Sequence, residues 1–264
     1  MLLGDWSSVE GAFFEEFTNN PEHYKDRQWT HVIDPFEIPS HWKIYRSFDF
    51  GYHRPFSVGY WSVDEEGVIY RIYEWYGCTG TDNEGLRIPP DKIFEEMAKL
   101  EREHPWLKGR KITGVADPSI WDASRGVSVA ESASKHGIFF TPGENSRIQG
   151  WMQCHYRLFF DENGYPMMYV FSNCKDFIRT IPALQYDDHK VEDLDTEGED
   201  HIADEFRYFC MSRPIKPRVN NKPDDYTGKN PLNLFLDIPK ENLGKATARP
   251  RMMIINKGDN DGSI

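Results

Sequence analysis

The sequence predicts a mixed α/β fold in which an antiparallel meander comes first and helices alternate with single strands after it. Between residues 41 and 77, three short segments rich in β-branched and aromatic residues are separated only by turn residues. After residue 88, amphipathic segments with helical spacing alternate with short apolar runs. The chain has 264 residues and is 39% hydrophobic, which is enough for one sizeable core.

The first predicted strand lies in HWKIYRSFDFG (41–51), where the side chains alternate between two faces. One face carries Trp42, Ile44, Phe48 and Phe50, and the other carries Tyr45, Ser47 and Asp49. RPFSVGYWSVD (54–64) and VIYRIYEWYG (68–77) follow as the second and third strands, joined by a short turn. An aspartate at the end of a buried strand is unexpected, because desolvation penalises a carboxylate.

Helices and strands alternate beyond the meander. PPDKIFEEMAKLEREHP (89–105) has apolar residues at helical spacing, with Pro90 at its start and Pro105 after its end. The other predicted elements are a buried strand in 109–119, a helix in 121–137, a strand in 138–143, a helix from 146, a β-hairpin over 156–172, and helices in 174–186 and 200–214. This order is the layout of an RNase H-like fold, a mixed sheet flanked by helices.

The two ends of the chain differ from the middle. Residues 1–40 combine an apolar stretch with proline-containing loops, and we expect a lead-in arm rather than core. Residues 214–264 are polar, with one apolar island, NPLNLFLDIP (230–239), which predicts a tail with a docking segment. The predicted division is therefore 1–40, 41–213 and 214–264.

The composition indicates the cellular compartment of the protein. No apolar run approaches the roughly 20 residues of a membrane span, and the first residues lack the features of a signal peptide. The four cysteines show no CxxC spacing, so we expect reduced thiols rather than zinc ligands or disulfides. A cytoplasmic protein without a membrane partner is the expectation.

The net charge of −12 argues against a simple DNA-binding module, because duplex DNA repels a negative surface. Acidic residues cluster in DDHKVEDLDTEGEDHIADE (187–205), however. A metal site concentrates carboxylates and is partly neutralised when a cation binds. The charge therefore counts less against a metal-dependent nuclease.

Three aspartates suggest such a site: Asp49 and Asp117 end predicted strands, and Asp204 lies on a late helix. Carboxylates so arranged suit two divalent cations about 4 Å apart, which activate water and stabilise the leaving oxygen of a phosphodiester. Each residue also has an ordinary explanation. Asp49 and Asp117 can be turn residues, and Asp204 can lie on a solvated helix face with Asp200.

Other chemistries lack their motifs. The sequence contains no G-x-x-x-x-G-K-[ST], no G-x-G-x-x-G, no G-x-S-x-G and no H-E-x-x-H. His201 lies three residues before Asp204, so on a helix it can stand near a metal as a ligand or proton carrier. A polar residue at the start of a helix is the equally good alternative for His201.

Four segments are similar to one known family: LLGDWSSVEGAFFEEF (2–17), YRSFDFGYHRPFSVGYWSVDEEGVIYRIYEWY (45–76), VADPSIW (115–121) and GEDHIADEFRY (198–208). Together they resemble the large terminase subunit of tailed bacteriophages, and more narrowly its C-terminal nuclease domain. The resemblance covers about residues 1–213. Its first segment is similar to the end of the family's ATPase domain and its linker, whereas the ATPase domain that drives translocation is missing, so no motor activity is expected.

The resemblance implies an RNase H-like endonuclease that cuts concatemeric double-stranded DNA with two Mg²⁺ or Mn²⁺ ions. The family's acids correspond to Asp49, Asp117 and Asp204, while Asp200 and His201 match flanking positions. The hairpin over 156–172 resembles one beside the family's active site. A terminase small subunit and a portal protein are the implied partners.

Arg54, Arg125 and Arg147 are candidates for holding backbone phosphates, although ordinary surface charge explains each of them as well. Two alternatives to the packaging nuclease stay open. One is another RNase H-like nuclease, such as a junction resolvase or transposase-like enzyme. The other is a non-catalytic docking module of the packaging machinery.

Overall fold

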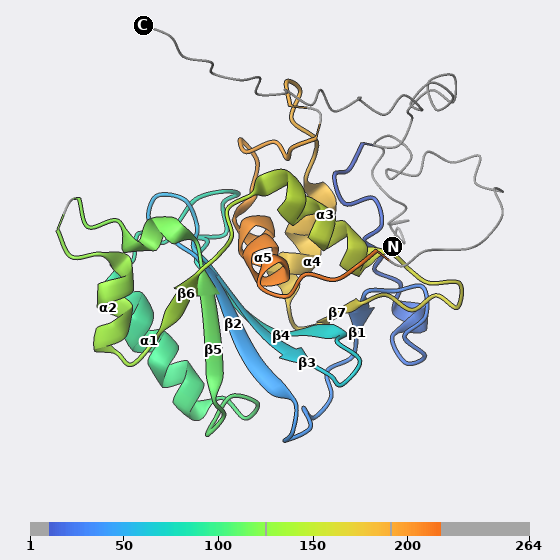
Figure 1. Ribbon diagram of the computed structural model, residues 1–264, viewed down its shortest axis with the longest axis horizontal. Coiled ribbons are helices and arrows are strands. Elements are labelled where there is room, and N and C mark those ends of the chain that lie inside the picture. Colours follow the sequence, from blue (N-terminus) through green and yellow to red (C-terminus); the bar gives the residue numbers. More distant parts are fainter. Residues whose placement is uncertain (1–10, 125, 191, 218–264) are drawn as a thin grey trace, which may run out of the picture. The chain divides into compact units, whose positions relative to one another are not determined.

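The structure, a computed structural model, describes residues 11–124, 126–190 and 192–217. Within these residues the strands form one seven-stranded mixed sheet in the order β1-β7-β4-β3-β2-β5-β6 (Figure 1). The strands are β1 (Val32–Ile33), β2 (Lys43–Asp49), β3 (Ser57–Val63), β4 (Ile69–Tyr76), β5 (Ile112–Ala116), β6 (Phe140–Pro142) and β7 (Met168–Phe171). The α-helices are α1 (Pro90–Glu103), α2 (Val129–Lys135), α3 (Arg147–Leu158), α4 (Lys175–Thr180) and α5 (His201–Met211). Three short 3-10 helices are η1 (Pro21–His23), η2 (Pro118–Trp121) and η3 (Ile181–Ala183).

The predicted meander and the mixed sheet are confirmed. β2, β3 and β4 pair antiparallel, whereas β5 pairs parallel with β2, and β6 parallel with β5. The turn between β3 and β4 is closed by Asp64, whose Oδ1 accepts hydrogen bonds from the amides of Glu66 and Val68. Gly67 in this turn has a φ of +82°, which favours glycine because a Cβ would be strained there.

The alternation along β2 separates two layers of helices. Phe48 packs on Phe94 of α1, with ring centroids 5.4 Å apart, on one face of the sheet. Tyr45 packs near Phe209 of α5, at 6.1 Å, on the other face. The predicted two faces of this strand are thus confirmed, and the side that carries Asp49 is the side covered by α5.

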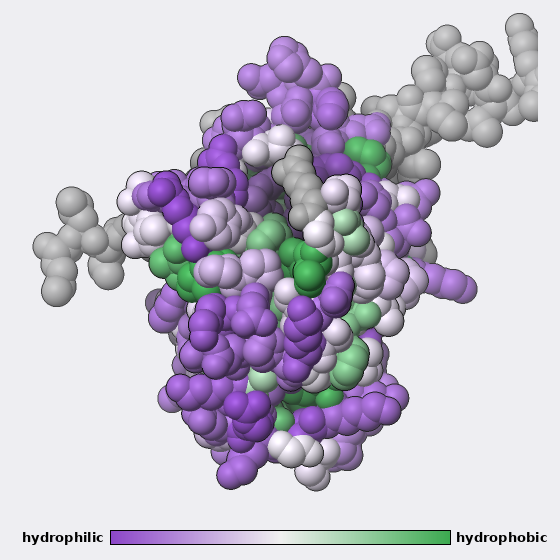
Figure 2. Space-filling model, turned by 90° about the vertical axis from the view of Figure 1, so that its left-hand side faces the viewer, coloured by the Kyte–Doolittle hydropathy of each residue, from purple (hydrophilic) through white to green (hydrophobic). Residues whose placement is uncertain are grey.

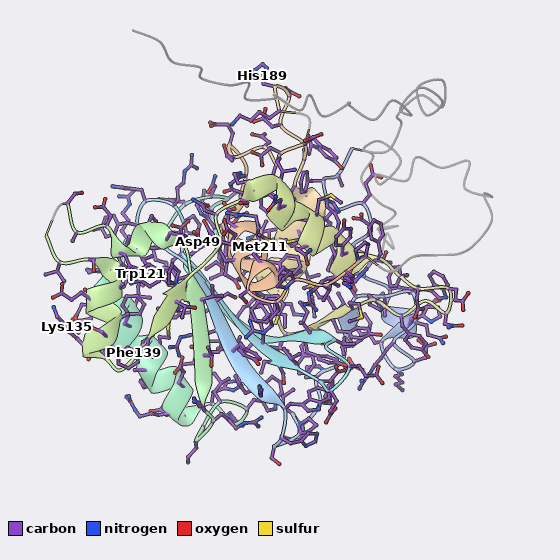
Figure 3. All side chains as sticks on the ribbon, in the orientation of Figure 1. Asp49, Trp121, Lys135, Phe139, His189 and Met211 are labelled. Carbon is purple, nitrogen blue, oxygen red and sulfur yellow. The ribbon has the colours of Figure 1, made fainter. Side chains whose placement is uncertain are left out.

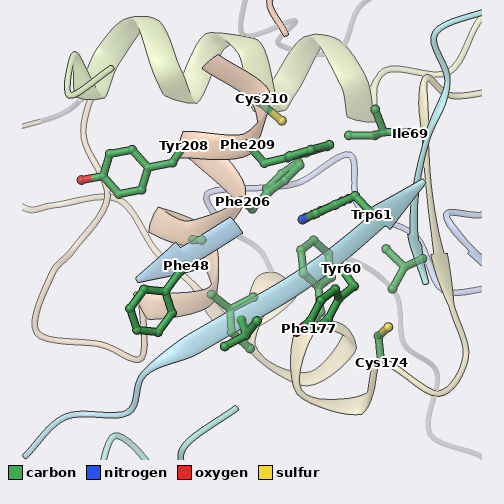
Figure 4. Packing of buried hydrophobic residues seen from close by; sticks show 14 of the residues in the cluster. Phe48, Tyr60, Trp61, Ile69, Cys174, Phe177, Phe206, Tyr208, Phe209 and Cys210 are labelled. Atoms are coloured by element: carbon green, nitrogen blue, oxygen red, sulfur yellow. The ribbon is translucent and has the colours of Figure 1, made fainter. Parts of the chain in front are cut away.

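Aromatic rings form the core between α5 and the sheet (Figure 4). Trp61 of β3 is fully buried and stacks on Phe209, with centroids 4.4 Å apart and planes 8° apart. Phe206 lies over the same indole at 5.7 Å, and Phe177 of α4 meets Phe206 edge-on at 5.5 Å. Stacked and edge-on pairs add to the free energy gained by burying the rings, so α5 is held firmly on the sheet.

The N-terminal region differs from the prediction of a lead-in arm. Phe13 and Phe14 are 1% exposed and pack on Trp151 of α3, while β1 pairs in parallel with β7. In the described residues of 1–40, the prediction of an arm outside the core is therefore wrong. Prolines between 35 and 39 indicated a connector, but the aromatic residues before them have enough apolar area to join the core.

The predicted β-hairpin over 156–172 is also wrong. Tyr156 to Leu158 complete α3, and only β7 is a strand, which pairs in parallel with β4. Arg157 and Leu158 are buried, and the Arg157 guanidinium donates to the carbonyl of Gly67, at 3.0 Å. Tertiary packing of this helical face outweighs the β-propensity of the aromatic run that follows it. Of the predicted 214–264 tail, residues 218–264 lie outside the described residues.

The face that carries α1 and α2 is mostly hydrophilic, with small apolar areas between the polar side chains (Figure 2). Among its exposed apolar side chains are Trp121 and Phe139, which lie near α2 and β6 (Figure 3). Within the described ranges, no helix is both long and apolar enough for a membrane span.

Candidate active site

Asp49 ends β2 and Asp117 directly follows the parallel neighbour β5, so both acids lie at the same edge of the sheet. β2 and β5 are in register with Phe48 opposite Ala116, so the next residue of each strand is an aspartate. The Asp117 amide donates to the carbonyl oxygen of Phe48, at 3.1 Å, which extends the pairing to the two acids. Ligand sites of α/β sheets gather beyond such carboxyl ends. Figure 3 shows Asp49 at this edge, close to α5.

The turn after Asp49 depends on Gly51. A Cβ at this residue would lie 2.3 Å from the carbonyl oxygen of Pro55, so any larger residue would open the turn. The chain reverses here and returns as β3, in which Ser57 pairs with Asp49. The sequence FDFG thus combines a strand-end acid with the glycine that lets the backbone fold back tightly beside it.

α5 brings a third acid and a histidine to this edge. The His201 Nδ1 lies 3.2 Å from Oδ2 of Asp49, so the first residue of the helix contacts the end of β2. His201 and Asp204 are three residues apart and therefore lie on one side of the helix. The carbonyl of Asp200, just before the helix, accepts from the Asp204 amide at 2.9 Å. The structure thus brings Asp49, Asp117, Asp200, His201 and Asp204 together.

The electrostatics reflect this crowding of negative charge. Burial, together with the charges of Asp204 and Asp117, raises the pKa of Asp49 to about 7, although His201 partly opposes the shift. Burial and the charge of Asp204 raise the pKa of Asp200 to about 6. The pKa of His201 is raised as well, because hydrogen bonding and the negative charge of Asp49 outweigh the opposing effect of burial. The cluster therefore favours positive charge, from protons or a cation.

Asp204 is held by two arginines. Arg147, the first residue of α3, donates from Nη1 to Oδ1 of Asp204 at 3.2 Å and from Nε to Oδ1 of Asp193 at 3.0 Å. Arg207, one turn further along α5, donates from Nε to the same oxygen of Asp204 at 3.0 Å. One nitrogen of each guanidinium, Nη2 of Arg147 and Nη1 of Arg207, is buried without a hydrogen-bond partner. The two ion pairs leave the Asp204 carboxylate few free acceptor positions.

Asp117 is held by a tyrosine from α5. The Tyr208 hydroxyl donates a short hydrogen bond to Oδ2 of Asp117 and lies 3.1 Å from Oδ1 of Asn145. Burial and the bond to Asp117 raise the pKa of Tyr208, so the hydroxyl keeps its proton. The other carboxylate oxygen, Oδ1 of Asp117, accepts from the Ser119 amide at 2.5 Å and caps η2.

The donor set suits a divalent metal by its chemistry, although the side chains are turned to protein partners. In the parts of the chain that the structure describes, no three His, Cys, Asp or Glu side chains form a group that could hold an ion as they stand. Asp204 faces arginines and Asp117 faces Tyr208, which accounts for this. Carboxylate oxygens are nevertheless the ligands that hard cations prefer. Burial, with a smaller contribution from Asp204 and Asp117, raises the pKa of Asp49, and a bound cation would offset the cost of a charged carboxylate there.

The three arginine candidates have different surroundings. Arg54 lies in the exposed loop after β2, where its Nη1 is 3.4 Å from the carbonyl of Asn83. Arg147 reaches the site but is paired with carboxylates, which was not predicted from the sequence. Arg125 lies outside the described residues.

Sequence reasoning missed the groups that hold the acids. Asp193 anchors Arg147 from a loop, and no local pattern reveals such a contact across 46 residues. Tyr208 lies four residues after Asp204, and this helical spacing is a usable signal for a role beside that acid. The sequence gives no sign that Glu205 is buried, because a charged residue beside Asp204 is typical of solvated helix surface.

Neither the protein-family models nor the curated proteins contain a match to this chain. Among solved structures, the large terminase of a thermophilic bacteriophage in complex with ADP matches with a TM-score of 0.58 and 24% identity. The match covers 79% of this chain and 46% of that one, so this chain spans less than half of the thermophilic phage protein. The P22 large terminase nuclease domain matches with a TM-score of 0.55 and 17% identity, over 77% of this chain and 92% of that domain. The chain therefore has the RNase H-like fold of large terminase nuclease domains.

Proposed function

We propose that this chain is the nuclease part of a viral DNA-packaging terminase and that it cuts concatemeric double-stranded DNA by metal-dependent hydrolysis of phosphodiester bonds. One observation carries the proposal: Asp49 is buried at the end of β2, and its pKa is raised to about 7 by burial and by two acids from distant parts of the chain. Asp49 pairs with no lysine or arginine of the described residues. Its partner is His201, at 3.2 Å, and the charges of Asp204 and Asp117 add to the rise of its pKa. The shared fold with the two phage terminase structures supports the same conclusion.

In this proposal, Asp49, Asp117 and Asp204 hold two Mg²⁺ or Mn²⁺ ions, and Asp200 assists from the start of α5. When bound, the ions supply positive charge that activates water and stabilises the leaving oxygen of the phosphodiester. The task of the protein is then to hold the acids at the sheet edge. Asp204 must turn from Arg147 toward the site, which frees this guanidinium to hold a backbone phosphate.

In the proposed reaction, His201 carries a proton. Its Nδ1 contacts Asp49, and its raised pKa lets it carry a proton near neutral pH. It would deliver this proton to the leaving oxygen when the phosphorus–oxygen bond of the phosphodiester breaks. Double-stranded DNA is the proposed substrate, and a terminase small subunit and a portal protein are the proposed partners.

A plasmid cleavage assay with Mn²⁺, Mg²⁺ or EDTA tests the proposal. Wild type should convert supercoiled plasmid to open and linear forms only with a metal, and Asp49→Asn and Asp117→Asn should each reduce the rate at least about 100-fold. Asp82→Asn is the matched control, because the Asp82 side chain is 93% exposed, and it should cleave like wild type.

Two further measurements distinguish this proposal from a junction resolvase and from a non-catalytic docking module. A junction resolvase would cut a four-way junction far faster than a linear duplex of the same sequence, whereas the proposed enzyme should not prefer the junction. A docking module would neither cleave nor bind Mn²⁺ in calorimetry. Folded wild type that shows no metal binding and no cleavage refutes the proposal.

A further inference from the structure

A second carboxylate of α5, Glu205, lies beside Asp204 in sequence but points into the core. It is 0% exposed and is surrounded by donors from three strands of the sheet. From β2, the Ser47 hydroxyl donates a short hydrogen bond to Oε1. From β3, the Ser57 hydroxyl donates to Oε2 at 3.1 Å, and the Trp61 indole N–H lies 3.3 Å from Oε1. From β4, Arg71 donates from Nη1 to Oε2 at 2.8 Å.

The sheet is shaped to receive this carboxylate. Gly59 stands opposite Ser47 in the β2–β3 register, and a Cβ there would lie 2.3 Å from Oε1 of Glu205 and 2.4 Å from Nη1 of Arg71. Any side chain at this residue would therefore displace the carboxylate or its guanidinium partner. A glycine inside a central strand weakens the strand, so close approach of another group is the physical reason for its presence.

A β-bulge completes the pocket. The pairing of β3 with β4 shifts between Tyr60 and Trp61, so Trp61 faces Arg71 while Gly59 faces Glu74. The extra residue places Arg71 and Glu74, three apart in sequence, on the same face of the sheet. Glu74 then accepts from Nε of Arg71 at 3.1 Å, and the guanidinium is held between Glu74 and Glu205. Burial lowers the pKa of Arg71, but the two carboxylates raise it further, so the arginine stays charged.

Such a buried ion pair contributes little net stability, because desolvating the charges cancels much of their attraction. The ion pair and its hydrogen bonds instead fix the position of α5 on the sheet, because all of these donors bind the two carboxylate oxygens of Glu205. This contact lies at the level of the candidate site: Ser47 is two residues before Asp49, and Ser57 is the partner of Asp49 in the register. Fixing Glu205 on these residues fixes Asp204 relative to Asp49.

We propose that Glu205 is a positioning residue that sets the spacing of Asp204 from Asp49 through its bonds to Ser47, Ser57 and Arg71. The inference rests on the proposed function for its consequence, which is that Glu205 governs metal affinity without touching the metal.

The test compares Glu205→Gln with Glu101→Gln in the full chain. Glu101 is the matched control, because it pairs with the buried Arg46 on the opposite face of the same strand and belongs to α1 rather than α5. Mn²⁺ affinity is measured by calorimetry, thermal unfolding gives the stability of each variant, and amide hydrogen exchange reports the order of α5. We expect both variants to lose stability, but only Glu205→Gln to bind Mn²⁺ at least about 10-fold more weakly and to exchange faster in α5.

Equal Mn²⁺ affinity and equal α5 exchange in the two variants would overturn the inference. Should Glu205→Gln not fold, the double variant Ser47→Ala and Ser57→Ala keeps the ion pair and removes both hydroxyl donors, together with the Ser47 oxygen that accepts from the Trp61 indole N–H at 2.6 Å. The same outcomes apply to this variant. Wild type that binds no Mn²⁺ refutes the proposed function instead. Hydrogen exchange then still decides whether Glu205 fixes α5, because that measurement needs no metal.

Discussion

Replacing Asp49 with asparagine should stabilise the metal-free protein at alkaline pH. The pKa of this carboxyl is about 7 in the folded chain, against an ordinary value of 3.8. A raised pKa means that the folded state holds the proton more tightly than the unfolded state. Stability is therefore greatest at low pH and falls as the pH rises from about 4 to about 7.

The size of the effect follows from this difference. At 1.36 kcal/mol for each pH unit, the charged carboxylate costs the folded state about 4 kcal/mol at pH 8. The asparagine of the variant does not ionise, so this cost disappears. At pH 5 the wild-type carboxyl is mostly protonated in the folded state. The gap between the free energies of unfolding of variant and wild type should therefore be about 3 kcal/mol smaller than at pH 8. The lost hydrogen bond to His201 offsets part of the gain at both values.

Urea unfolding of wild type and Asp49→Asn in EDTA at pH 8, 6.5 and 5 measures this gap. Asp82→Asn, at an exposed carboxylate, should show no gap that changes with pH. Adding Mn²⁺ at pH 8 should stabilise wild type and not Asp49→Asn, because a bound cation offsets the cost of the charged Asp49 carboxylate. A gap that is constant between pH 5 and pH 8 would refute the reasoning, as would a variant less stable than wild type at pH 8.

Three further outcomes follow from the structure. Gly59→Ala should lower the free energy of unfolding by about 1–3 kcal/mol, because the added Cβ meets Glu205. The control Gly198→Ala, where the nearest atom is 3.7 Å from the added Cβ, should change it by less than about 1 kcal/mol. Urea unfolding of both variants measures these changes. A thiol reagent should label the part-exposed Cys78 of the native protein quickly and the three buried cysteines only after unfolding, which mass spectrometry of the modified chain checks. Tyr208→Phe should cost about 1 kcal/mol by removing the donor to Asp117, and an unchanged unfolding midpoint would contradict the role of this bond.

Much of the fold can be predicted from local patterns, because the spacing of apolar residues differs between strands and helices. The alternation along 41–51 predicted the correct faces of β2, and the helix predicted from 89–105 begins at Pro90 and ends at Glu103. The prediction of a β-hairpin over 156–172 was wrong for a physical reason. Aromatic and β-branched residues favour strands in general, yet Leu158 belongs to the apolar face of α3 and is buried there.

The candidate acids were recognisable because strand ends and a helix face are local features. Their partners were not, since Arg147 and Asp193 meet only after the whole chain has folded. Glu205 shows the difficulty most clearly. By sequence it is one of several acids on a charged helix, and only the assembled sheet, with Gly59 and the bulge between β3 and β4, shows that it is buried.

The position of α5 in the chain has a consequence for synthesis. Asp49 and Asp117 are made early, and the strands that carry them can pair while the rest of the chain is still being translated. α5, at residues His201–Met211, follows every strand of the sheet in the described residues. The candidate acids Asp49, Asp117 and Asp204 therefore come together only after this helix has left the ribosome and packed on the sheet. Under the proposed function, an unfinished chain therefore lacks the nuclease site.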